Sequence, residues 1–275
     1  DAHGRLVHEP EPWPDFPVDS ARLWDTRTTW AHLEPADDAW QFGPLEAHLD
    51  AAERAGVADV LLVLGGTPAW AASDPAAEGA PWLPVGSASP PERIEDWRDY
   101  ARTVAERYGD RIDVYQVGNE PNFRWFWHGS PREMASLVSA AADEIRAADP
   151  TATIVGPGPV VSDPASAWAA GRWWKALRHC DVDVLAFQWY PQQGTPASVV
   201  TEVSARLRKA IEGTTLRRLP VWITEVNHHG AAADLVPGTM RAAARAGIER
   251  VYWYAWTDIP PPGLMLLQAD SRAGR

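Results

Sequence analysis

The segment Asp113-Val114-Tyr115-Gln116-Val117-Gly118 is typical of a buried β-strand, because it is short and contains β-branched and aromatic residues. A helical pattern follows over Pro131–Ala148. Its start is marked by Ser130 and Glu133, which have the spacing of a capping box, with proline at the first helical position. A second short apolar run, Thr153–Gly156, comes next. A strand, a helix and a strand in this order predict a βα unit and a parallel sheet.

The same alternation continues along the chain and predicts eight strands with helices between them. The strands are expected at His3–His8, Ala21–Asp25, Asp59–Leu64, Asp113–Gly118, Thr153–Gly156, Asp183–Trp189, Val221–Thr224 and Arg250–Ala255. The helical patterns cover Leu45–Ala55, Glu92–Tyr108, Pro131–Ala148, Ala197–Glu212 and Thr239–Ala246. This α/β pattern in 275 residues matches a (β/α)8 TIM barrel, which takes ~250 residues, so we expect one domain over residues 1–275. An open doubly wound sheet would show a glycine-rich phosphate turn after its first strand, and the sequence has none.

The composition limits the partners of the chain. It has 25 lysine and arginine residues against 37 acidic residues, a net charge of −12, which argues against binding to nucleic acid or to an anionic membrane. No apolar run approaches the ~20 residues that cross a bilayer. The single cysteine, Cys180, excludes a disulfide framework within the chain. The chain begins at Asp1 without a signal-like segment, and we expect a secreted or extracellular protein, with the cytoplasm as the alternative.

Two long loops after predicted strands are rich in aromatic residues. Ala71–Pro91 contains five prolines and Trp82, and Phe123–Gly129 contains Trp125 and Trp127. Loops in this position form the C-terminal rim of a barrel, where barrels carry their active sites. We expect Trp125 and Trp127 either to pack this rim or to stack against sugar rings, because tryptophan offers a large flat surface for both.

Two glutamates stand at the ends of predicted strands. Glu120 lies in Val117-Gly118-Asn119-Glu120-Pro121-Asn122, after the fourth strand, and Glu225 lies in Trp222-Ile223-Thr224-Glu225-Val226-Asn227, after the seventh. These strands lie nearly opposite each other in a barrel of eight, so both carboxyl groups are expected in one cleft. One protonated and one ionised carboxyl group suit glycoside hydrolysis. Each glutamate alone could equally be an exposed strand-end residue or an ion-pair partner.

These motifs resemble glycoside hydrolase clan A, the retaining (β/α)8 glycosidases. Arg22-Leu23-Trp24-Asp25 followed by Trp30, and Phe126-Trp127-His128-Gly129 after the first glutamate, are most similar to family 39. That family contains β-xylosidases and α-L-iduronidases, and family 5 is a more distant relative. The resemblance covers the whole predicted barrel in strand order.

The resemblance implies a role for several residues. Glu120 would be the general acid/base and Glu225 the nucleophile, while Asn119 would hydrogen-bond the sugar 2-hydroxyl group. Arg22 and Tyr190 would contact Glu225. A carboxylate beside a guanidinium and a phenol stays ionised, whereas a carboxyl group in a drier site keeps its proton to higher pH.

Two further residues complete the implied site. Trp256 would form the floor of the subsite for the reacting sugar. From its place just beyond Glu225, either His228 or His229 is expected to contact the substrate or to support a residue that does. The adjacent His228 and His229 lack the spacing of a metal-binding motif, so we expect no metal and no cofactor.

Plain structural roles remain open for the supporting residues. Arg22 could form a structural pair with Asp25, Tyr190 could pack the core before Pro191, and Trp256 could pack the barrel.

The chain also departs from the family. Family 39 β-xylosidases carry a β-sandwich after the barrel, but here only Thr257–Arg275 follows the eighth strand. That stretch contains three consecutive prolines and predicts a rim loop without an eighth helix. This departure weighs against an exo-acting xylosidase more than against the clan, because a cleft without the extra domain can be open at both ends, as endo action requires.

We therefore expect a retaining glycosidase that cleaves an equatorial, β-type bond in an oligosaccharide or polysaccharide. One alternative is a catalytically inactive carbohydrate-binding barrel. The other is a phosphate-binding barrel enzyme, and the acidic charge and the missing phosphate loop argue against this second alternative. The identity of the sugar and the oligomeric state are not determined by these patterns.

Overall fold

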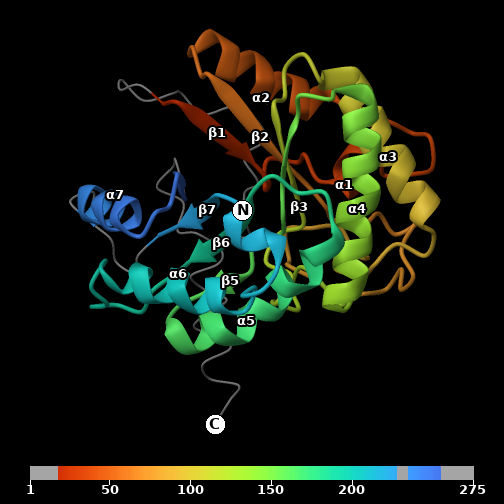
Figure 1. The fold of residues 1–275 in the computed structure, drawn as a ribbon. Helices are drawn as coiled ribbons and strands as arrows, with labels where there is room; N and C mark the ends of the chain where they lie inside the picture. Colours follow the sequence, from red (N-terminus) through yellow and green to blue (C-terminus); the bar gives the residue numbers. More distant parts are fainter. Residues whose placement is uncertain (1–17, 228–234, 255–275) are drawn as a thin grey trace.

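The computed structural model describes residues 18–227 and 235–254. The predicted strand His3–His8 and the predicted rim loop Thr257–Arg275 lie outside the described residues. Strands and helices alternate along the described chain, with the strands in the centre and the helices around them (Figure 1). The predicted (β/α)8 barrel is thus confirmed.

The described strands are all parallel and form two four-stranded sheets, ordered β1-β2-β3-β4 and β5-β6-β7-β8. Their bounds are β1 Ser20–Leu23, β2 Asp59–Leu64, β3 Val114–Val117, β4 Thr153–Val155, β5 Val160–Val161, β6 Leu185–Trp189, β7 Val221–Val226 and β8 Arg250–Trp253. The fourth and seventh strands predicted from the sequence are therefore β3 and β7.

The two sheets meet between β4, which is the predicted strand Thr153–Gly156, and the short β5, which was not predicted. β4 pairs with β3, β5 pairs with β6, and a single parallel bridge joins Val155 to Val184. The turn 156–159 separates β4 from β5, because its two prolines have no N–H group for a sheet. On the opposite side β1 and β8 lie together, and the hydroxyl oxygens of Ser20 and Tyr252 are 2.8 Å apart.

The helices form the outer layer. They are α1 Trp30–Leu33, α2 Gly43–Arg54, α3 Ile94–Tyr108, α4 Pro131–Ala148, α5 Pro164–Ala176, α6 Val199–Lys209 and α7 Leu235–Arg245, with short 3-10 helices η1 Leu177–His179 and η2 Thr215–Arg218. The capping box of α4 forms as predicted, because Ser130 Oγ accepts from the Glu133 N–H group at 3.2 Å and a Glu133 oxygen accepts from the Ser130 N–H group at 2.7 Å.

The short helix α1 and the helix α5 were not predicted. The N-cap of α5 is Asp163, whose carboxylate accepts from the Ser166 N–H group at 2.7 Å, and Pro164 is its first residue. These are the same start signals as those of α4. The sequence between the predicted strands Thr153–Gly156 and Asp183–Trp189 therefore carried a helix signal that the periodicity alone did not reveal.

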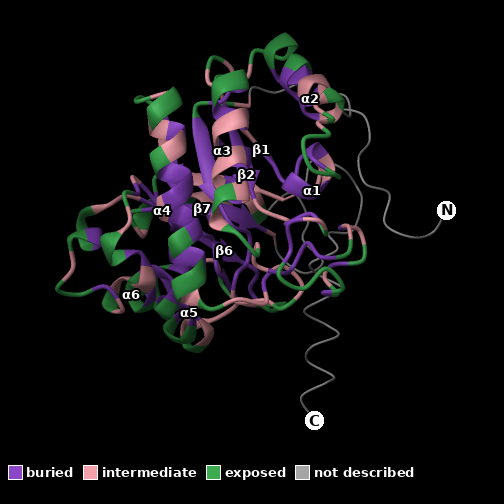
Figure 2. Cartoon of the chain, turned by 90° about the vertical axis from the view of Figure 1, so that its right-hand side faces the viewer, coloured by how far each residue is buried: buried purple, intermediate pink, exposed green. Residues whose placement is uncertain are grey.

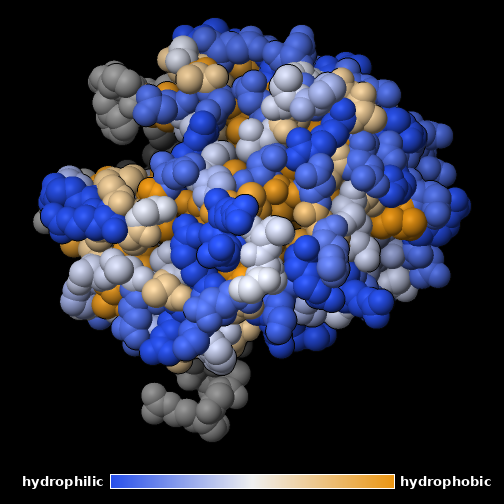
Figure 3. Space-filling model, in the orientation of Figure 1, coloured by the Kyte–Doolittle hydropathy of each residue, from blue (hydrophilic) through white to orange (hydrophobic). Residues whose placement is uncertain are grey.

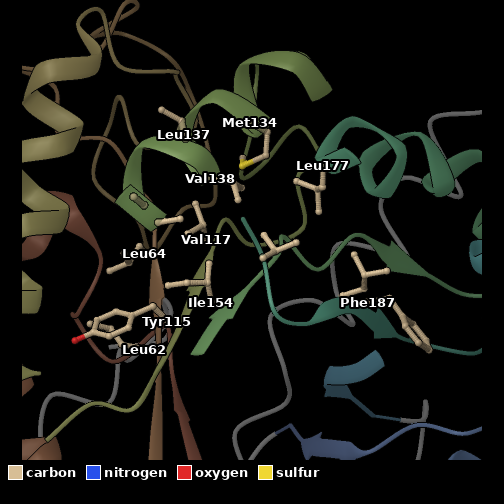
Figure 4. Close-up of a cluster of buried hydrophobic side chains, with 14 of the residues drawn as sticks. Leu62, Leu64, Tyr115, Val117, Met134, Leu137, Val138, Ile154, Leu177 and Phe187 are labelled. Atoms are coloured by element: carbon tan, nitrogen blue, oxygen red, sulfur yellow. The ribbon is translucent and has the colours of Figure 1, made fainter. Parts of the chain in front are cut away.

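The strands are buried on both faces, as in other parallel barrels. On the outer face, Leu62, Leu64, Tyr115 and Val117 pack in one cluster with Met134, Leu137 and Val138 of α4 (Figure 4). On the inner face a second cluster contains Leu61, Val63, Val114, Ala186 and Trp222. Exposed residues lie mainly on the outer sides of the helices (Figure 2).

The visible surface is largely polar. The face seen in Figure 3 is mostly hydrophilic, with hydrophobic residues visible near its centre. Within residues 18–227 and 235–254, none of the helices has both the length and the apolar character that a membrane crossing requires.

Candidate active site

Polar side chains lie above the apolar interior of the barrel, towards the carboxyl ends of the strands. Gln116 and Gln188 stand two residues beyond Val114 and Ala186, which face the interior, so they share that face. Arg22 of β1 joins them, since its Nε donates to Gln116 Oε1 at 3.1 Å. Both glutamines have no exposed surface. A polar layer therefore closes the apolar interior at the predicted rim.

Glu225 reaches this layer because β7 carries a bulge. Trp222 faces the interior, and strict alternation would bring Thr224 rather than Glu225 to the same face. The register shifts, however, since Ile223 pairs with Phe187 while Glu225 pairs with the next residue of β6, Gln188. Two residues of β7 thus oppose one of β6, which turns the Glu225 side chain into the polar layer.

Two side chains hold the Glu225 carboxylate. Arg22 Nη1 donates to its Oε2 at 2.9 Å, and the Tyr190 hydroxyl donates to its Oε1. Burial raises the pKa of Glu225 above its ordinary value, while Arg22 and the Tyr190 hydrogen bond act in the opposite direction. The side chain is anchored at both oxygens and partly neutralised by the guanidinium. The predicted pairing of Arg22 and Tyr190 with Glu225 therefore agrees with the geometry.

Glu120 follows β3 in an unusual backbone conformation. Its φ of +38° lies in the left-handed region, which costs a non-glycine residue about 1–2 kcal/mol. The Glu120 N–H group donates to Gly158 O at 3.2 Å, and its carbonyl accepts from the Phe123 N–H group at 2.8 Å. Gly118 has a φ of +84°, and a Cβ there would lie 2.7 Å from Met134 Sδ, so this approach requires glycine. Strain held by surrounding contacts is a feature of functional sites.

The environment of Glu120 favours its protonated form. Burial raises the pKa of Glu120 well above its ordinary value, the nearby Glu225 carboxylate raises it further, and Arg22 lowers it. The Glu225 carboxylate, in contrast, accepts hydrogen bonds directly from Arg22 and Tyr190. Two coupled carboxyl groups with unequal environments can act as a proton donor and an ionised partner in one reaction.

Asn119 belongs to the same cluster. It is buried, and its Oδ1 accepts from Arg22 Nη2 at 2.6 Å and lies 2.6 Å from Gln188 Nε2. The structure therefore brings together five of the predicted site residues: Arg22, Asn119, Glu120, Tyr190 and Glu225.

Two of the predicted tryptophans lie within the described residues. Trp127 is buried in the outer core, its Nε1 donates to Ser130 O at 3.4 Å, and it also lines a hollow beside Asn119. Trp125 is half-buried and packs against the inner-face cluster, with its ring centroid 6.2 Å from that of Trp82. Trp256 and His228 lie outside the described residues.

A narrow hollow opens beside Asn119 at the ends of β2 and β3. Its lining includes Trp24, Gly65, Asn119 and Phe126. The Trp24 and Phe126 rings meet edge to face at a centroid distance of 6.0 Å. Aromatic rings from two rim loops thus lie next to the polar cluster.

Sequence reasoning missed Gln116, Gln188 and the pair of Tyr254 with Asp25. The Tyr254 hydroxyl donates to Asp25 Oδ2 and joins the end of β8 to the end of β1. The two glutamines could have been found, because each is a polar residue at an inward position of an otherwise apolar strand.

In the described part of the chain, one set of three acidic residues has carboxylate oxygens close enough together to bind a metal ion. Glu34, Asp37 and Asp38 lie on the turn after α1. The Glu34 carboxylate already accepts from Trp30 Nε1 at 2.7 Å and from the Asp38 N–H group at 3.0 Å. These bonds give Glu34 a structural role, and nothing in the cluster around Glu120 calls for a metal.

For the glycoside hydrolysis that the resemblance of the sequence implies, replacing Arg22 by methionine is expected to lower kcat/KM for an aryl glycoside by about 10- to 100-fold, the range for a lost hydrogen bond to a charged group. Because Arg22 lowers the pKa of both Glu225 and Glu120, its loss should move both limbs of the pH–rate profile to higher pH. The profile of kcat/KM against pH measures both effects. Arg98→Met, which removes a surface contact between α3 and α4, is the control. Unmoved limbs in Arg22→Met would contradict this account.

A barrel with two buried carboxyl groups at its rim is the arrangement that the resemblance to the (β/α)8 glycosidases predicts. The chain belongs to the family described as the glycosyl hydrolase catalytic core, which matches residues 95–257, more than half of the chain. This region includes both Glu120 and Glu225. The predicted membership of the glycosidases is thereby confirmed.

Solved structures with the same fold support this assignment. A glucosidase from Croceicoccus marinus is 13% identical, with a TM-score of 0.67 over 90% of this chain and 59% of its own. A GH39 enzyme from Xanthomonas axonopodis pv. citri is 18% identical, with a TM-score of 0.67 over 87% of this chain and 53% of its own. A monomeric β-xylosidase from Caulobacter crescentus is 19% identical, with a TM-score of 0.61 over 80% of this chain and 49% of its own.

The chain thus spans between about half and three fifths of the length of these structures. No curated protein matches it. The family match confirms the resemblance to the glycoside hydrolases, and the solved structures, which include a GH39 enzyme, show the same fold.

Proposed function

We propose that this barrel is a retaining glycoside hydrolase for an equatorial, β-type bond in an oligosaccharide or polysaccharide. Glu120 is the general acid/base and Glu225 the nucleophile. The observation that carries the proposal is that the two buried carboxyl groups have different hydrogen-bond partners and different surroundings. Glu225 is held by Arg22 and Tyr190, whereas burial and Glu225 itself favour the proton on Glu120.

In the first step the Glu120 carboxyl group gives its proton to the glycosidic oxygen while a Glu225 oxygen attacks the anomeric carbon. The bond from that carbon to the leaving oxygen breaks, the alcohol departs, and a glycosyl ester forms on Glu225. In the second step the Glu120 carboxylate takes a proton from water, the water oxygen attacks the anomeric carbon, and the Glu225 carboxylate leaves. Two displacements at one carbon retain its configuration.

The neighbouring side chains support these steps. Arg22 and Tyr190 fix the two oxygens of Glu225, so that the carboxylate keeps one orientation for its attack. Asn119 lies between the two glutamates in the hydrogen-bond network and is placed to bind the sugar 2-hydroxyl group.

The test is hydrolysis of a panel of aryl β-D-glycosides and polysaccharides, with the first-formed anomer followed by NMR. The aryl panel should include glucosides, xylosides, galactosides and mannosides. Release of the β-anomer supports the proposal and names the sugar. Release of the α-anomer from a β-substrate overturns the retaining mechanism. Binding of oligosaccharides without hydrolysis of any member would instead favour an inactive carbohydrate-binding barrel.

A further inference from the structure

We propose that Asp25 is a specificity-determining residue, whose carboxylate binds a hydroxyl group of the sugar held at Glu225. The inference rests on the proposed function, because it concerns the sugar on which the two glutamates act. It gives a binding role to an acidic residue that is neither of the two reacting carboxyl groups.

Asp25 lies at the rim of the barrel. It stands two residues beyond Leu23, the last residue of β1. The same strand carries Arg22, which donates to Glu225 and to Asn119. Asp25 therefore follows a strand whose carboxyl end already supplies the polar layer. The residue is only half-buried, so a ligand can reach it.

Tyr254 holds the Asp25 side chain from the end of β8. Tyr252 faces the apolar interior, so Tyr254, two residues further along, is expected on the same face above it. The Tyr254 N–H group donates to Val226 O at 2.9 Å, next to Glu225 in the chain. The Tyr254 hydroxyl donates to Asp25 Oδ2. The Asp25 carboxylate is thus fixed on the side of the rim on which Glu225 lies.

The electrostatics agree with this placement. Burial raises the pKa of Glu225, and the Asp25 carboxylate raises it further. Burial, Asp25 and Glu225 all raise the pKa of Tyr254, whereas Arg22 lowers it. Tyr254 therefore lies within electrostatic reach of both carboxyl groups. A sugar ring held at Glu225 is expected to lie next to Asp25.

The Asp25 carboxylate has acceptor positions beyond the one that Tyr254 uses. An ionised carboxyl group offers about four lone-pair positions and donates no hydrogen bond. Sugar hydroxyl groups are donors, and a hydrogen bond to a charged acceptor is about twice as strong as one between neutral groups. A half-exposed carboxylate at the rim therefore suits a substrate hydroxyl group. Since the 2-hydroxyl group is given to Asn119, we expect Asp25 to bind a different hydroxyl group of the same ring.

The closure of the barrel does not depend on this carboxylate. Ser20 and Tyr252 already join β1 to β8 through two neutral hydroxyl groups, whose oxygens are 2.8 Å apart. A second junction lies at the amino ends of the strands, where Arg250 Nη1 donates to Asp59 Oδ2 at 2.6 Å. At the rim, a second negative charge disfavours the ionised form of Glu225. A neutral pair would avoid that cost, so the charge is expected where a ligand uses it.

The test is a cycle that combines Asp25→Ala with changes in the substrate. The probes are the 4-nitrophenyl β-D-glycoside of the sugar that the wild-type chain hydrolyses and its monodeoxy analogues, each of which lacks one ring hydroxyl group. We expect kcat/KM for the parent glycoside to fall by about 10- to 100-fold in Asp25→Ala, the range for a lost hydrogen bond to a charged group. The analogue without the bound hydroxyl group should lose a similar factor in the wild type and no more in the variant. Losses that multiply for every analogue would overturn the inference.

Asp59→Asn is the matched control. Asp59 is also a half-buried carboxylate that is tied to β8, but it lies at the amino end of its strand. This variant should leave kcat/KM for the parent and for every analogue unchanged. If Asp25→Ala does not fold, Asp25→Asn keeps the size of the side chain and an acceptor for Tyr254. The same analogue should then lose less in Asp25→Asn than in the wild type.

Calorimetry separates this inference from the proposed function. Absence of hydrolysis by a wild-type chain that binds xylohexaose, cellohexaose or mannohexaose would overturn the proposed function alone. Asp25→Ala should still weaken that binding by about 10-fold or more. Equal affinities of the wild type and Asp25→Ala would overturn the role of Asp25. A wild-type chain that neither hydrolyses nor binds any of these probes would overturn both.

Discussion

Glu225→Gln is expected to lower kcat/KM for aryl β-glycosides by about 10⁴-fold, a rise of about 5.5 kcal/mol in the activation barrier. The amide is a poor nucleophile and cannot form the glycosyl ester, although it keeps the shape of the side chain. It still accepts a hydrogen bond from Arg22 or Tyr190, so the surrounding cluster should stay in place. Steady-state kinetics with a dinitrophenyl glycoside and mass spectrometry of a glycosyl-enzyme intermediate measure the two effects.

Glu34→Gln is the matched control for this variant. Glu34 is also a buried carboxyl group that accepts hydrogen bonds, but it lies on the turn after α1 and contacts Trp30. It should alter the melting temperature more than the rate. A Glu225→Gln protein that is folded and retains more than about a tenth of wild-type activity would exclude Glu225 as the nucleophile.

Glu120→Ala is expected to have the second-largest effect, and the size should depend on the leaving group. Loss of a general acid costs about 10²- to 10⁴-fold for a substrate that needs protonation. Dinitrophenyl glycosides should react with Glu225 nearly as before, so that the intermediate accumulates and kcat is limited by the second step. Because the raised pKa of Glu120 would set the basic limb of the profile, that limb should disappear in the variant. Rates for a series of leaving groups across pH measure both effects.

Added azide provides the control for Glu120→Ala. The anion can enter the space left by the side chain and attack the intermediate without a general base. A rise in kcat with the dinitrophenyl substrate and a β-glycosyl azide product are expected. Equal losses for all leaving groups, together with a basic limb that stays in place, would show that Glu120 is not the acid/base.

Local sequence signals determined most of the fold. The periodicity predicted seven strands that lie within the described residues, from the strand ending near Leu23 to the strand ending near Trp253. The capping signals of Ser130 and Pro131 defined the start of α4 correctly. The same signals at Asp163 and Pro164 were not used, and α5 was missed for that reason.

The candidate site was predictable to the extent that it depends on strand ends. Parallel strands bring their carboxyl ends to one rim, so Glu120 and Glu225 had to lie on the same side of the barrel. The resemblance to clan A added Arg22 and Tyr190, which indeed bond Glu225. Trp127 packs in the core and also lines the hollow beside Asn119, and its stacking against a sugar stays a prediction.

The sequence by itself thus determined the barrel, the rim and the two carboxyl groups, because these follow from periodicities and residue types along the chain. Only the tertiary structure decided which polar groups meet. The bulge in β7 turns Glu225 inward, against the alternation that its neighbours follow. The contacts of Gln188 with Asn119 and Glu120 join strands far apart in the sequence. Such contacts depend on sheet register and on the closure of the barrel, which no local pattern specifies.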